Sequence, residues 1–389
     1  MIFSSYLHTS VAILKLYKGN EPFHLYIKKF FATNKKYGSR DRKQIASLCY
    51  NYFRLGHSFK KITIEEKIIL ATFLIEPTPS AFLESAKPEW NALSEKPLKE
   101  KLSTLSAQEG ILNIFPFQDE LSEGIDAEKF AASFLIQPDV FLRVRPGNEK
   151  RVTGKLSGAG ISYKKISDNC LAISNASKLD DVLELDKEAV VQDHNSQRTG
   201  DLIKLKTTNH KHQTKVWDCC AASGGKSIMA YDIDPKIDLT VSDIRVSILQ
   251  NLKTRFAKAG ITKYNSFVVD LTTNNKLQTR NFDLIICDAP CTGSGTWSRT
   301  PEQLYFFKKE SIEKYAVLQK QILQNVINSL KPGGKLLYIT CSVFKKENEE
   351  VVKYVKEELK LQLERSEMFK GYEMKADTLF AALFTAPRV

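Results

Sequence analysis

The sequence predicts an α/β protein in which a mostly parallel sheet, with helices on both faces, follows an all-helical N-terminal domain. Three observations support this prediction. Residues 1–135 show helical apolar spacing, residues 136–195 mix strand and helix patterns, and residues 196–389 alternate short apolar runs with amphipathic helices. We therefore expect three domains with these boundaries, which suits a length of 389 residues at roughly 100–200 residues per domain.

The helical pattern of the first domain is clearest around residue 50. Ile45, Leu48, Cys49 and Tyr52 follow the i, i+3, i+4, i+7 spacing of one helix face, and Glu65–Ile75 has the pattern of another apolar helix. Five prolines between residues 77 and 116 interrupt the chain and indicate short helices there. Few segments of this domain resemble strands.

Short apolar runs predict the strands of the other two domains. In the small α/β segment we expect strands over Val140–Val144 and Cys170–Ser174, with a helix over Glu149–Gly158 between them. The Lys-Pro-Gly-Gly sequence at 331–334 is expected to form a turn before the last of the parallel strands. The strands expected in the last domain are Lys215–Cys220, Leu239–Asp243, Ser266–Asp270, Leu284–Pro290 and Lys335–Cys341.

Positive charge is concentrated at one end of the chain. The protein has 57 Lys and Arg against 45 Asp and Glu, a net charge of +12. Residues 1–61 hold 12 of these bases and only two acids, so they carry +10, and the remaining residues carry +2. A basic surface on one domain indicates a polyanionic partner, most simply a nucleic acid.

Cysteine and histidine spacing argues against disulfides and against a resident metal. The seven cysteines are an odd number without a Cys-x-x-Cys pair, and the six histidines are scattered. The first ten residues lack the pattern of a signal peptide, and no run of about 18 apolar residues exists that could span a membrane. We therefore expect a reduced, soluble, cytoplasmic protein.

A loop of small residues follows the first expected strand of the last domain. It runs from Cys220 through Ala221, Ala222, Ser223, Gly224 and Gly225 to Lys226. Such a turn between a strand and a helix lets backbone N–H groups approach a ligand closely. The glycine that a Walker A loop requires is replaced by Cys220, and the G-x-G-x-x-G fingerprint is absent, so a phosphate-binding loop is disfavoured.

Acidic residues end the next three expected strands. Asp243, Asp270 and Asp288 fall at successive strand ends, where ligands lie in sheets of this kind. Each alone is equally well explained as a helix cap or a solvated loop residue. Together, one carboxylate can accept ribose hydroxyls and another can meet an adenine amino group. They favour a nucleoside without phosphates, and S-adenosylmethionine fits that description.

Two cysteines stand at the ends of strands at the same edge. Cys291 lies in the segment 288–295 (Asp-Ala-Pro-Cys-Thr-Gly-Ser-Gly), and Cys341 lies in Thr-Cys-Ser at 340–342. Most strand cysteines are simply small buried residues, which we expect of Cys49, Cys219 and Cys287. Beside a methyl donor, however, a thiol has a specific use. Carbon 5 of a pyrimidine becomes nucleophilic only after a thiolate adds to carbon 6, and Asp288 could hydrogen-bond the N3/N4 edge of that base.

These motifs, in this order, resemble those of the RsmB/Nop/Sun-type RNA cytosine-5 methyltransferases, most closely the bacterial RsmB branch. Upstream, the Gly-Ser-Arg-Asp-Arg sequence at 38–42 resembles the NusB-like RNA-binding domain of that branch, and Phe-Ala-Ala-Leu at 380–383 resembles the terminal strand. The resemblance implies a Rossmann-like class I S-adenosylmethionine-dependent methyltransferase domain after the NusB-like domain and the small α/β segment.

The resemblance also implies roles for individual residues. Cys341 matches the nucleophile, Cys291 matches the cysteine that assists product release, and the cofactor is held by the loop 220–226 with Asp243, Asp270 and Asp288. One departure is Ser223, where the family usually has proline, so we expect a less rigid loop and weaker cofactor binding. Another is the polar stretch Lys204–Lys215, which is longer than usual and is either an RNA contact or a solvated loop.

Several alternatives remain open from the sequence. The RsmB branch implies ribosomal RNA of the small subunit as substrate, but relatives also modify transfer RNA. A ribosome-assembly factor with a vestigial methyltransferase fold would explain Ser223 and the basic N-terminal domain. A DNA cytosine methyltransferase would use Cys291 as its nucleophile and leave Cys341 without a role, although the helical domain argues against it.

Overall fold

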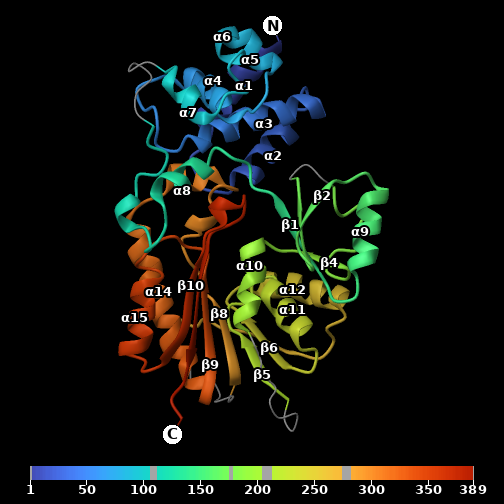
Figure 1. The fold of residues 1–389 in the computed structure, drawn as a ribbon, viewed down its shortest axis with the longest axis vertical. Coiled ribbons are helices and arrows are strands. Elements are labelled where there is room, and N and C mark those ends of the chain that lie inside the picture. Colours follow the sequence, from blue (N-terminus) through green and yellow to red (C-terminus); the bar gives the residue numbers. More distant parts are fainter. Residues whose placement is uncertain (1, 106–111, 175–177, 204–212, 274–281, 389) are drawn as a thin grey trace. The chain divides into compact units, whose positions relative to one another are not determined.

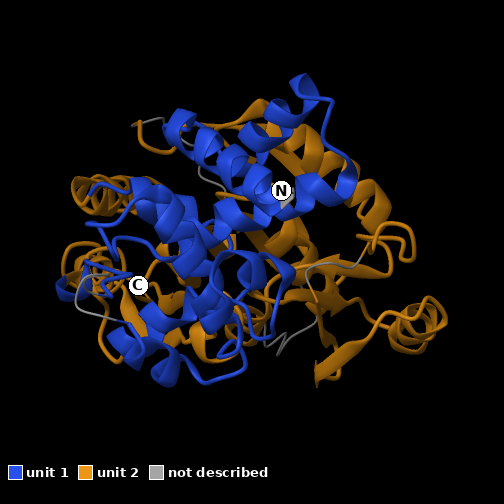
Figure 2. Cartoon of the chain, turned by 90° about the horizontal axis from the view of Figure 1, so that it is seen from above, with its two compact units in different colours: residues 1–119, 126–137, 296–308 blue, residues 120–125, 138–295, 309–389 orange. Residues whose placement is uncertain are grey.

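The computed structural model describes residues 2–105, 112–174, 178–203, 213–273 and 282–388. The chain divides into two compact units, coloured separately in Figure 2. Unit 1 comprises residues 1–119, 126–137 and 296–308, and unit 2 comprises residues 120–125, 138–295 and 309–389. Most of the polar stretch Lys204–Lys215, namely residues 204–212, lies outside the described residues.

Unit 1 is built from helices, as the apolar spacing predicts. Ile45, Leu48 and Cys49 are fully buried on one face of α3, and a capping box formed by Thr63 and Glu66 starts α4. Its helices are α1 (Ile2–Leu16), α2 (Phe23–Thr33), α3 (Ser39–Arg54), α4 (Ile64–Ile75), α5 (Ala81–Ala86), α6 (Pro88–Asn91), α7 (Leu98–Ser103), α8 (Ala127–Ser133) and α13 (Pro301–Phe306).

The helix α13 joins unit 1 through aromatic and polar contacts, although it comes from the far end of the sequence. The Tyr305 and Tyr52 hydroxyls are 2.9 Å apart, and the ring of Phe306 packs edge-on against that of Tyr17. Arg54 is buried in the same unit and donates hydrogen bonds to the carbonyl oxygens of Phe134 and Ser298. Arg54 therefore has a structural role, and 11 of the 12 bases of residues 1–61 remain at least partly exposed.

Unit 2 contains a small antiparallel sheet and a large mixed sheet. The small sheet has the order β2-β3-β1-β4, and the helix α9 (Glu149–Gly158) connects β1 to β2. Apolar side chains of β1, β3 and α9 form its core. Its strands are β1 (Val140–Val144), β2 (Tyr163–Ser167), β3 (Cys170–Ile173) and β4 (Ala189–Val191). The sequence pattern indicates β1, β3 and α9, but it does not indicate β2 and β4.

The large sheet has the order β10-β11-β9-β8-β5-β6-β7. From β9 to β7 all neighbours pair in parallel, and β11 runs antiparallel to both of its neighbours, β9 and β10. Its strands are β5 (Lys215–Asp218), β6 (Asp238–Asp243), β7 (Asn265–Val268), β8 (Phe282–Asp288), β9 (Leu330–Thr340), β10 (Gln362–Phe369) and β11 (Leu379–Thr385). This is the mostly parallel sheet that the strand–helix alternation predicts.

Helices cover both faces of the large sheet (Figure 1). On one face α11 (Gly225–Ile233) and α12 (Val246–Ala259) bury Ile228, Leu252 and Phe256, and on the other α14 (Glu310–Val326) and α15 (Glu349–Glu357) bury Leu323 and Val351. A short helix, α10 (His194–Arg198), leads into the sheet. None of the described helices is long and apolar enough to cross a membrane.

The expected turn at 331–334 is wrong. These residues belong to β9, where the pairing with β8 jumps from Phe282 opposite Leu330 to Leu284 opposite Lys335. The extra residues form an irregularity in a continuing strand, and Gly333 adopts the positive φ of 73° that such an irregularity needs. The Pro-Gly-Gly sequence is thus accommodated within the strand and does not end it.

Candidate active site

The small-residue loop after β5 turns sharply before α11 begins. Ala222 and Gly224 both have positive φ, 46° and 85°, and a Cβ on Gly224 would lie 2.7 Å from the ring of Phe256. Only glycine meets both demands without strain. Ser223, where the family resemblance leads us to expect proline, is held by Arg255, which donates to its carbonyl oxygen at 3.0 Å and to its Oγ at 2.9 Å.

Arg255 is itself fixed by an ion pair with Asp186, whose Oδ1 lies 2.6 Å from Nη2. The serine that departs from the family pattern is therefore anchored by a side chain from α12. This contact is specific to a residue with an Oγ, because proline could offer only its carbonyl oxygen. It counters the flexibility that the absence of proline would otherwise introduce.

A cavity of about 460 Å³ opens at the carboxyl ends of the parallel strands. Its volume lies in the range of small-molecule sites, about 300–1,000 Å³. Of the predicted cofactor residues, Cys220, Ala222, Asp243, Asp270 and Asp288 line it, together with apolar side chains such as Leu271, Leu318 and Ile322. Of the described residues, Ala221, Ser223, Gly224, Gly225 and Lys226 belong to the loop and helix start and are not part of the lining.

The two acids after β6 and β7 are held by hydrogen bonds. Asp243 accepts from the backbone N–H of Ala222 at 3.0 Å and from the guanidinium of Arg245 at 3.0 Å. Burial opposes its ionisation, but the donors from Arg245 and Ala222 outweigh burial and hold the pKa of Asp243 below its ordinary value. Asp270 accepts from the hydroxyl and N–H of Thr272, which lowers its pKa. Both side chains are therefore carboxylates at neutral pH.

These features suit a nucleoside. Two carboxylates that accept hydrogen bonds stand among aliphatic side chains that can pack on a base, and no described arginine or lysine other than Arg245 lines the cavity. Arg245 is not among the residues expected at the site, although a basic residue two positions after an acid at a strand end could indicate a residue of the cavity. The residues present thus fit S-adenosylmethionine, which carries hydroxyl and amino groups but no phosphate.

The two predicted cysteines meet at this edge of the sheet. Cys291 follows β8 and lines the cavity, whereas Cys341 directly follows β9. A side-chain hydrogen bond with Cys291, together with burial, raises the pKa of Cys341 well above its ordinary value. The nearby Lys226 ammonium acts in the opposite direction. Cys341 is therefore a neutral thiol at rest, beside a cation that favours its thiolate.

Lys226 links the cysteines to Asp288. Its Nζ donates to Oδ2 of Asp288 at 2.6 Å, and only 8% of Lys226 is exposed. Burial alone would lower its pKa, but Asp288 and Cys341 raise it above the ordinary value, so Lys226 is an ammonium. From its position in the sequence, Lys226 is expected in the cofactor loop. In the structure its ammonium group is bonded to Asp288 and interacts with Cys341, which are predicted catalytic residues.

One buried carboxylate, which no sequence pattern singles out, holds the loops of both cysteines. Glu347 accepts hydrogen bonds from the N–H and hydroxyl of Thr292, at 2.9 and 2.6 Å, and from the hydroxyl of Ser342 at 2.5 Å. Gln319 donates to it at 3.0 Å. Thr292 follows Cys291 and Ser342 follows Cys341, so Glu347 fixes the two segments relative to each other.

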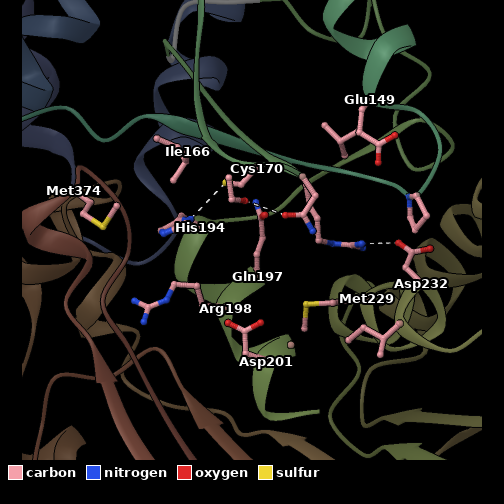
Figure 3. A pocket seen from close by; sticks show the side chains of 17 residues that line it. Glu149, Ile166, Cys170, His194, Gln197, Arg198, Asp201, Met229, Asp232 and Met374 are labelled. Carbon is pink, nitrogen blue, oxygen red and sulfur yellow. Dashed lines mark hydrogen bonds and ion pairs between the residues drawn. The ribbon is translucent and has the colours of Figure 1, made fainter. Parts of the chain in front are cut away.

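A second cavity in unit 2, of about 700 Å³, lies apart from these residues (Figure 3). Its walls come from the small sheet, α10 and α11, and include the ion pair of Arg143 with Asp232 at 2.5 Å. The Sγ of Cys170 lies 3.4 Å from Nδ1 of His194 in the same wall. None of the sequence-predicted site residues, all of which are described, lines this cavity.

The parallel sheet with a nucleoside-sized cavity at its carboxyl edge defines an S-adenosylmethionine-dependent methyltransferase. A family model described as "16S rRNA methyltransferase RsmB/F" matches residues 175–384, more than half of the chain. The chain belongs to this family. The family resemblance, the fold class and the S-adenosylmethionine cofactor expected from the sequence are thereby confirmed.

Curated relatives and solved structures agree with this assignment. The chain is 34% identical over 174 residues to ribosomal RNA small subunit methyltransferase B of Shewanella oneidensis, and 27% identical over 232 residues to the probable enzyme of that name in Bacillus subtilis. These matches cover 44% and 58% of this chain. They span 39% and 51% of the relatives, so the chain matches about half of their length or less.

Two solved structures share the fold. The crystal structure of PH0851 has a TM-score of 0.67 at 19% identity and covers 96% of both chains. NSun6 from Pyrococcus horikoshii, solved with SFG, has a TM-score of 0.58 at 15% identity and covers 76% of this chain and 98% of its own. At these identities the likeness concerns the fold.

Proposed function

We propose that this protein methylates carbon 5 of a cytosine in ribosomal RNA of the small subunit, with S-adenosylmethionine as methyl donor. The observation that carries the proposal is the placement of Cys291 and Cys341 after the neighbouring strands β8 and β9, close enough to interact and beside the nucleoside-sized cavity. Methylation of a nitrogen requires no thiol, whereas methylation of carbon 5 does. The names of the curated relatives support ribosomal RNA of the small subunit as the substrate.

The cofactor would be held by the cavity residues. The carboxylates of Asp243 and Asp270 would accept hydroxyl and amino donors of the nucleoside, and Leu271, Leu318 and Ile322 would pack on its base. S-adenosylmethionine, when bound there, supplies an electrophilic methyl group. Because Cys291 lines the same cavity, the methyl group and the thiols would lie on the same side of the sheet.

Cys341 would act as the nucleophile. Its thiol would give up its proton to solvent and the thiolate would add to carbon 6 of the cytosine, so that carbon 5 gains the electron density to take up the methyl group and leaves the donor as a neutral thioether. Lys226 favours this thiolate electrostatically. Asp288, held by Lys226, would bond the N3/N4 edge of the base and stabilise the adduct.

Cys291 would assist the last step. Carbon 5 must lose its proton so that the bond between Sγ of Cys341 and carbon 6 can break, which releases methylated cytosine and the free thiolate. Cys291 lies close enough to Cys341 to interact with it and is therefore near the bond that breaks. The target cytosine has to reach a half-buried thiol, so extrusion from a helix or a single-stranded loop is expected.

Tritiated methyl transfer to small-subunit RNA tests the chemistry. Cys341→Ala should abolish transfer, and Cys291→Ala should accumulate a covalent protein–RNA adduct that survives denaturing electrophoresis. Cys49→Ala, which removes a buried cysteine of unit 1, serves as the control and should retain transfer. Full activity of Cys341→Ala would contradict the mechanism, and greater incorporation into DNA than into RNA would favour a DNA cytosine methyltransferase.

Bisulfite sequencing tests the substrate. Ribosomal and transfer RNA from a strain that lacks the protein should differ from wild type at a cytosine of small-subunit ribosomal RNA. A difference confined to transfer RNA would assign the alternative substrate. If no RNA changes and calorimetry detects no S-adenosylmethionine binding, the protein is an assembly factor with a methyltransferase fold.

A further inference from the structure

Three cysteine thiols converge in unit 2 next to the proposed active site, and none of them takes part in the proposed bond-making steps at Cys341 and Cys291. The Sγ atoms of Cys219, Cys220 and Cys287 all lie within 4.8 Å of one another. Cys219 and Cys220 directly follow β5, and Cys287 is the penultimate residue of β8. The two strands pair in parallel with Asp218 opposite Ile286, so the backbone ladder places these cysteines side by side.

We propose that Cys219, Cys220 and Cys287 form a binding site for a thiophilic d10 cation such as Zn²⁺ or Cu⁺. With metal–sulfur bonds of about 2.3 Å, the sulfurs of a trigonal or tetrahedral site lie roughly 3.8–4.0 Å apart. The three thiols need to move by less than about 1 Å to reach this spacing. Three sulfurs without an oxygen or nitrogen ligand select soft cations over Mg²⁺ or Ca²⁺.

Binding is an acid–base and coordination step without a change of oxidation state. The thiols release their protons to solvent, and each thiolate gives one lone pair to the metal. The surroundings favour a cation, because the buried carboxyl group of Asp218 interacts electrostatically with Cys287 and its Oδ1 has no hydrogen-bond partner among the described residues, whereas Asp288 is already paired with Lys226. A positive ion at the centre of the three sulfurs would be attracted to the carboxyl group of Asp218.

The site is accessible from one side. Cys219 and Cys287 are buried, at 1% and 0% exposure, whereas Cys220 is only partly buried. Cys219 and Cys220 both line the 460 Å³ cavity, which would give a metal ion its entry path and leave room for a water or thiol as a fourth ligand. The spacing of the cysteines in the sequence does not indicate this site, because 66 residues separate Cys220 from Cys287 and strand pairing brings them together.

Cadmium is a suitable probe of this site because it prefers thiolate ligands. The intensity of its sulfur-to-metal charge-transfer absorption increases with the number of bound thiolates. Reduced full-length protein, titrated with Cd²⁺ alone, should bind one equivalent with the ultraviolet intensity of three sulfur ligands. Cys220→Ser should lower that intensity by about a third and weaken binding at least tenfold, because a lost ligand costs no less than the 10–100-fold of an outer-shell partner. Cys220 is partly exposed, so this variant carries little risk of misfolding.

Matched variants separate this site from other thiols. Cys49→Ser, in unit 1, and the double variant Cys291→Ser/Cys341→Ser, which removes the neighbouring thiol pair, should both keep the three-sulfur band. Cys219→Ser should lose it as Cys220→Ser does, with folding of each variant checked by circular dichroism. Absence of the band in the wild-type protein, or its loss only in the Cys291/Cys341 variant, would overturn the proposal. Neither readout depends on methyl transfer.

Discussion

The backbone N–H of Gly295 donates a hydrogen bond to the carbonyl oxygen of Cys341 at 2.9 Å. The carbonyl of Gly295 in turn accepts from the N–H of Thr378 at 3.0 Å. A Cβ on Gly295 would lie 1.9 Å from the carbonyl oxygen of Thr378 and 3.2 Å from that of Cys341. The glycine is therefore required by close backbone approach, and it ties the Cys291 loop to the segment that carries Cys341, the proposed nucleophile.

Gly295→Ala should accordingly displace the backbone at Cys341. We expect methyl transfer to fall at least tenfold and the free energy of unfolding to decrease by about 1–3 kcal/mol, the usual cost of overpacking. Kinetics and chemical denaturation measure the two effects. The matched control is Gly154→Ala within α9, where a Cβ meets nothing within 4 Å. That substitution should leave transfer unchanged and stabilise the helix by about 1 kcal/mol.

Glu347 also fixes the positions of the two segments that carry Cys291 and Cys341. Glu347→Gln retains the shape, but an amide NH₂ in the place of Oε2 faces the N–H donors of both Thr292 and Gln319, and in the place of Oε1 it faces the hydroxyls of Thr292 and Ser342. We expect kcat to fall while S-adenosylmethionine binding, measured by calorimetry, stays within about twofold, because Glu347 does not line the cavity. The unfolding free energy should drop by roughly 1–3 kcal/mol, the cost of an unsatisfied buried group.

Glu350→Gln, an exposed neighbour in the same acidic run, controls for the loss of one charge. It should behave as wild type in all three measurements. If Glu347→Gln weakened cofactor binding as strongly as it reduced kcat, Glu347 would support the whole domain and not the cysteine segments in particular.

The sequence predicts the cysteines and the cofactor acids because each has a local signal, a distinctive residue at the end of an apolar run. Glu347 has no such signal, since it lies in the run Lys-Lys-Glu-Asn-Glu-Glu (345–350), which resembles a solvated surface. Its burial depends on Thr292, 55 residues away in the chain. The strand β10 was missed for a similar reason, because Gln-Leu-Glu-Arg-Ser-Glu-Met-Phe (362–369) is mostly polar and is a strand only as the partner of β11.

A count of charged residues along the sequence also does not show which of them are buried by tertiary contacts. Arg54 counts toward the basic N-terminal region but is 3% exposed, and it satisfies carbonyl oxygens inside unit 1. Similarly, α13 lies beyond β8 in the sequence, yet its Tyr305 and Phe306 pack against aromatic side chains of unit 1. Contacts between residues so far apart in the sequence cannot be inferred from hydrophobic periodicity, which indicates only which residues share a face of one helix or strand.

Glu302 predicts a pH dependence of stability in unit 1. It is 2% exposed, accepts from the N–H of Phe23 at 3.2 Å, and has a second oxygen with no hydrogen-bond partner among the described residues. Burial raises the pKa of Glu302 above the ordinary 4.5. The folded state therefore retains the proton longer than the unfolded chain, so this contribution to stability is full below pH 4.5 and is lost as the pH rises through the raised pKa.

Glu302→Gln removes this titration. The unfolding free energy of the variant should decline less steeply than that of wild type as the pH rises above 4.5, as measured by urea denaturation at several pH values. Glu95→Gln removes an exposed carboxylate of the same unit and should follow the wild-type pH profile. Parallel profiles for wild type and Glu302→Gln would show that Glu302 does not titrate differently on folding.

The exposed lysine and arginine side chains of unit 1 predict an affinity for RNA that falls as the salt concentration rises. Lys35 and Lys36 are both exposed between α2 and α3, within the region that carries +10. If each contacts a phosphate, Lys35→Gln/Lys36→Gln should reduce the slope of log K against log salt concentration by about 1.4–1.8, at 0.7–0.9 per phosphate. Filter binding or fluorescence anisotropy at several salt concentrations measures this slope.

The double variant Lys253→Gln/Lys263→Gln removes the same charge from exposed positions of unit 2 and serves as the control. Its slope should stay close to wild type, because the charge outside residues 1–61 is nearly balanced. Cofactor affinity should be unaffected in both variants, since none of these lysines lines the 460 Å³ cavity. Equal slope changes in the two variants would mean that RNA responds to net charge alone, and the assignment of phosphate contacts to the N-terminal region would be wrong.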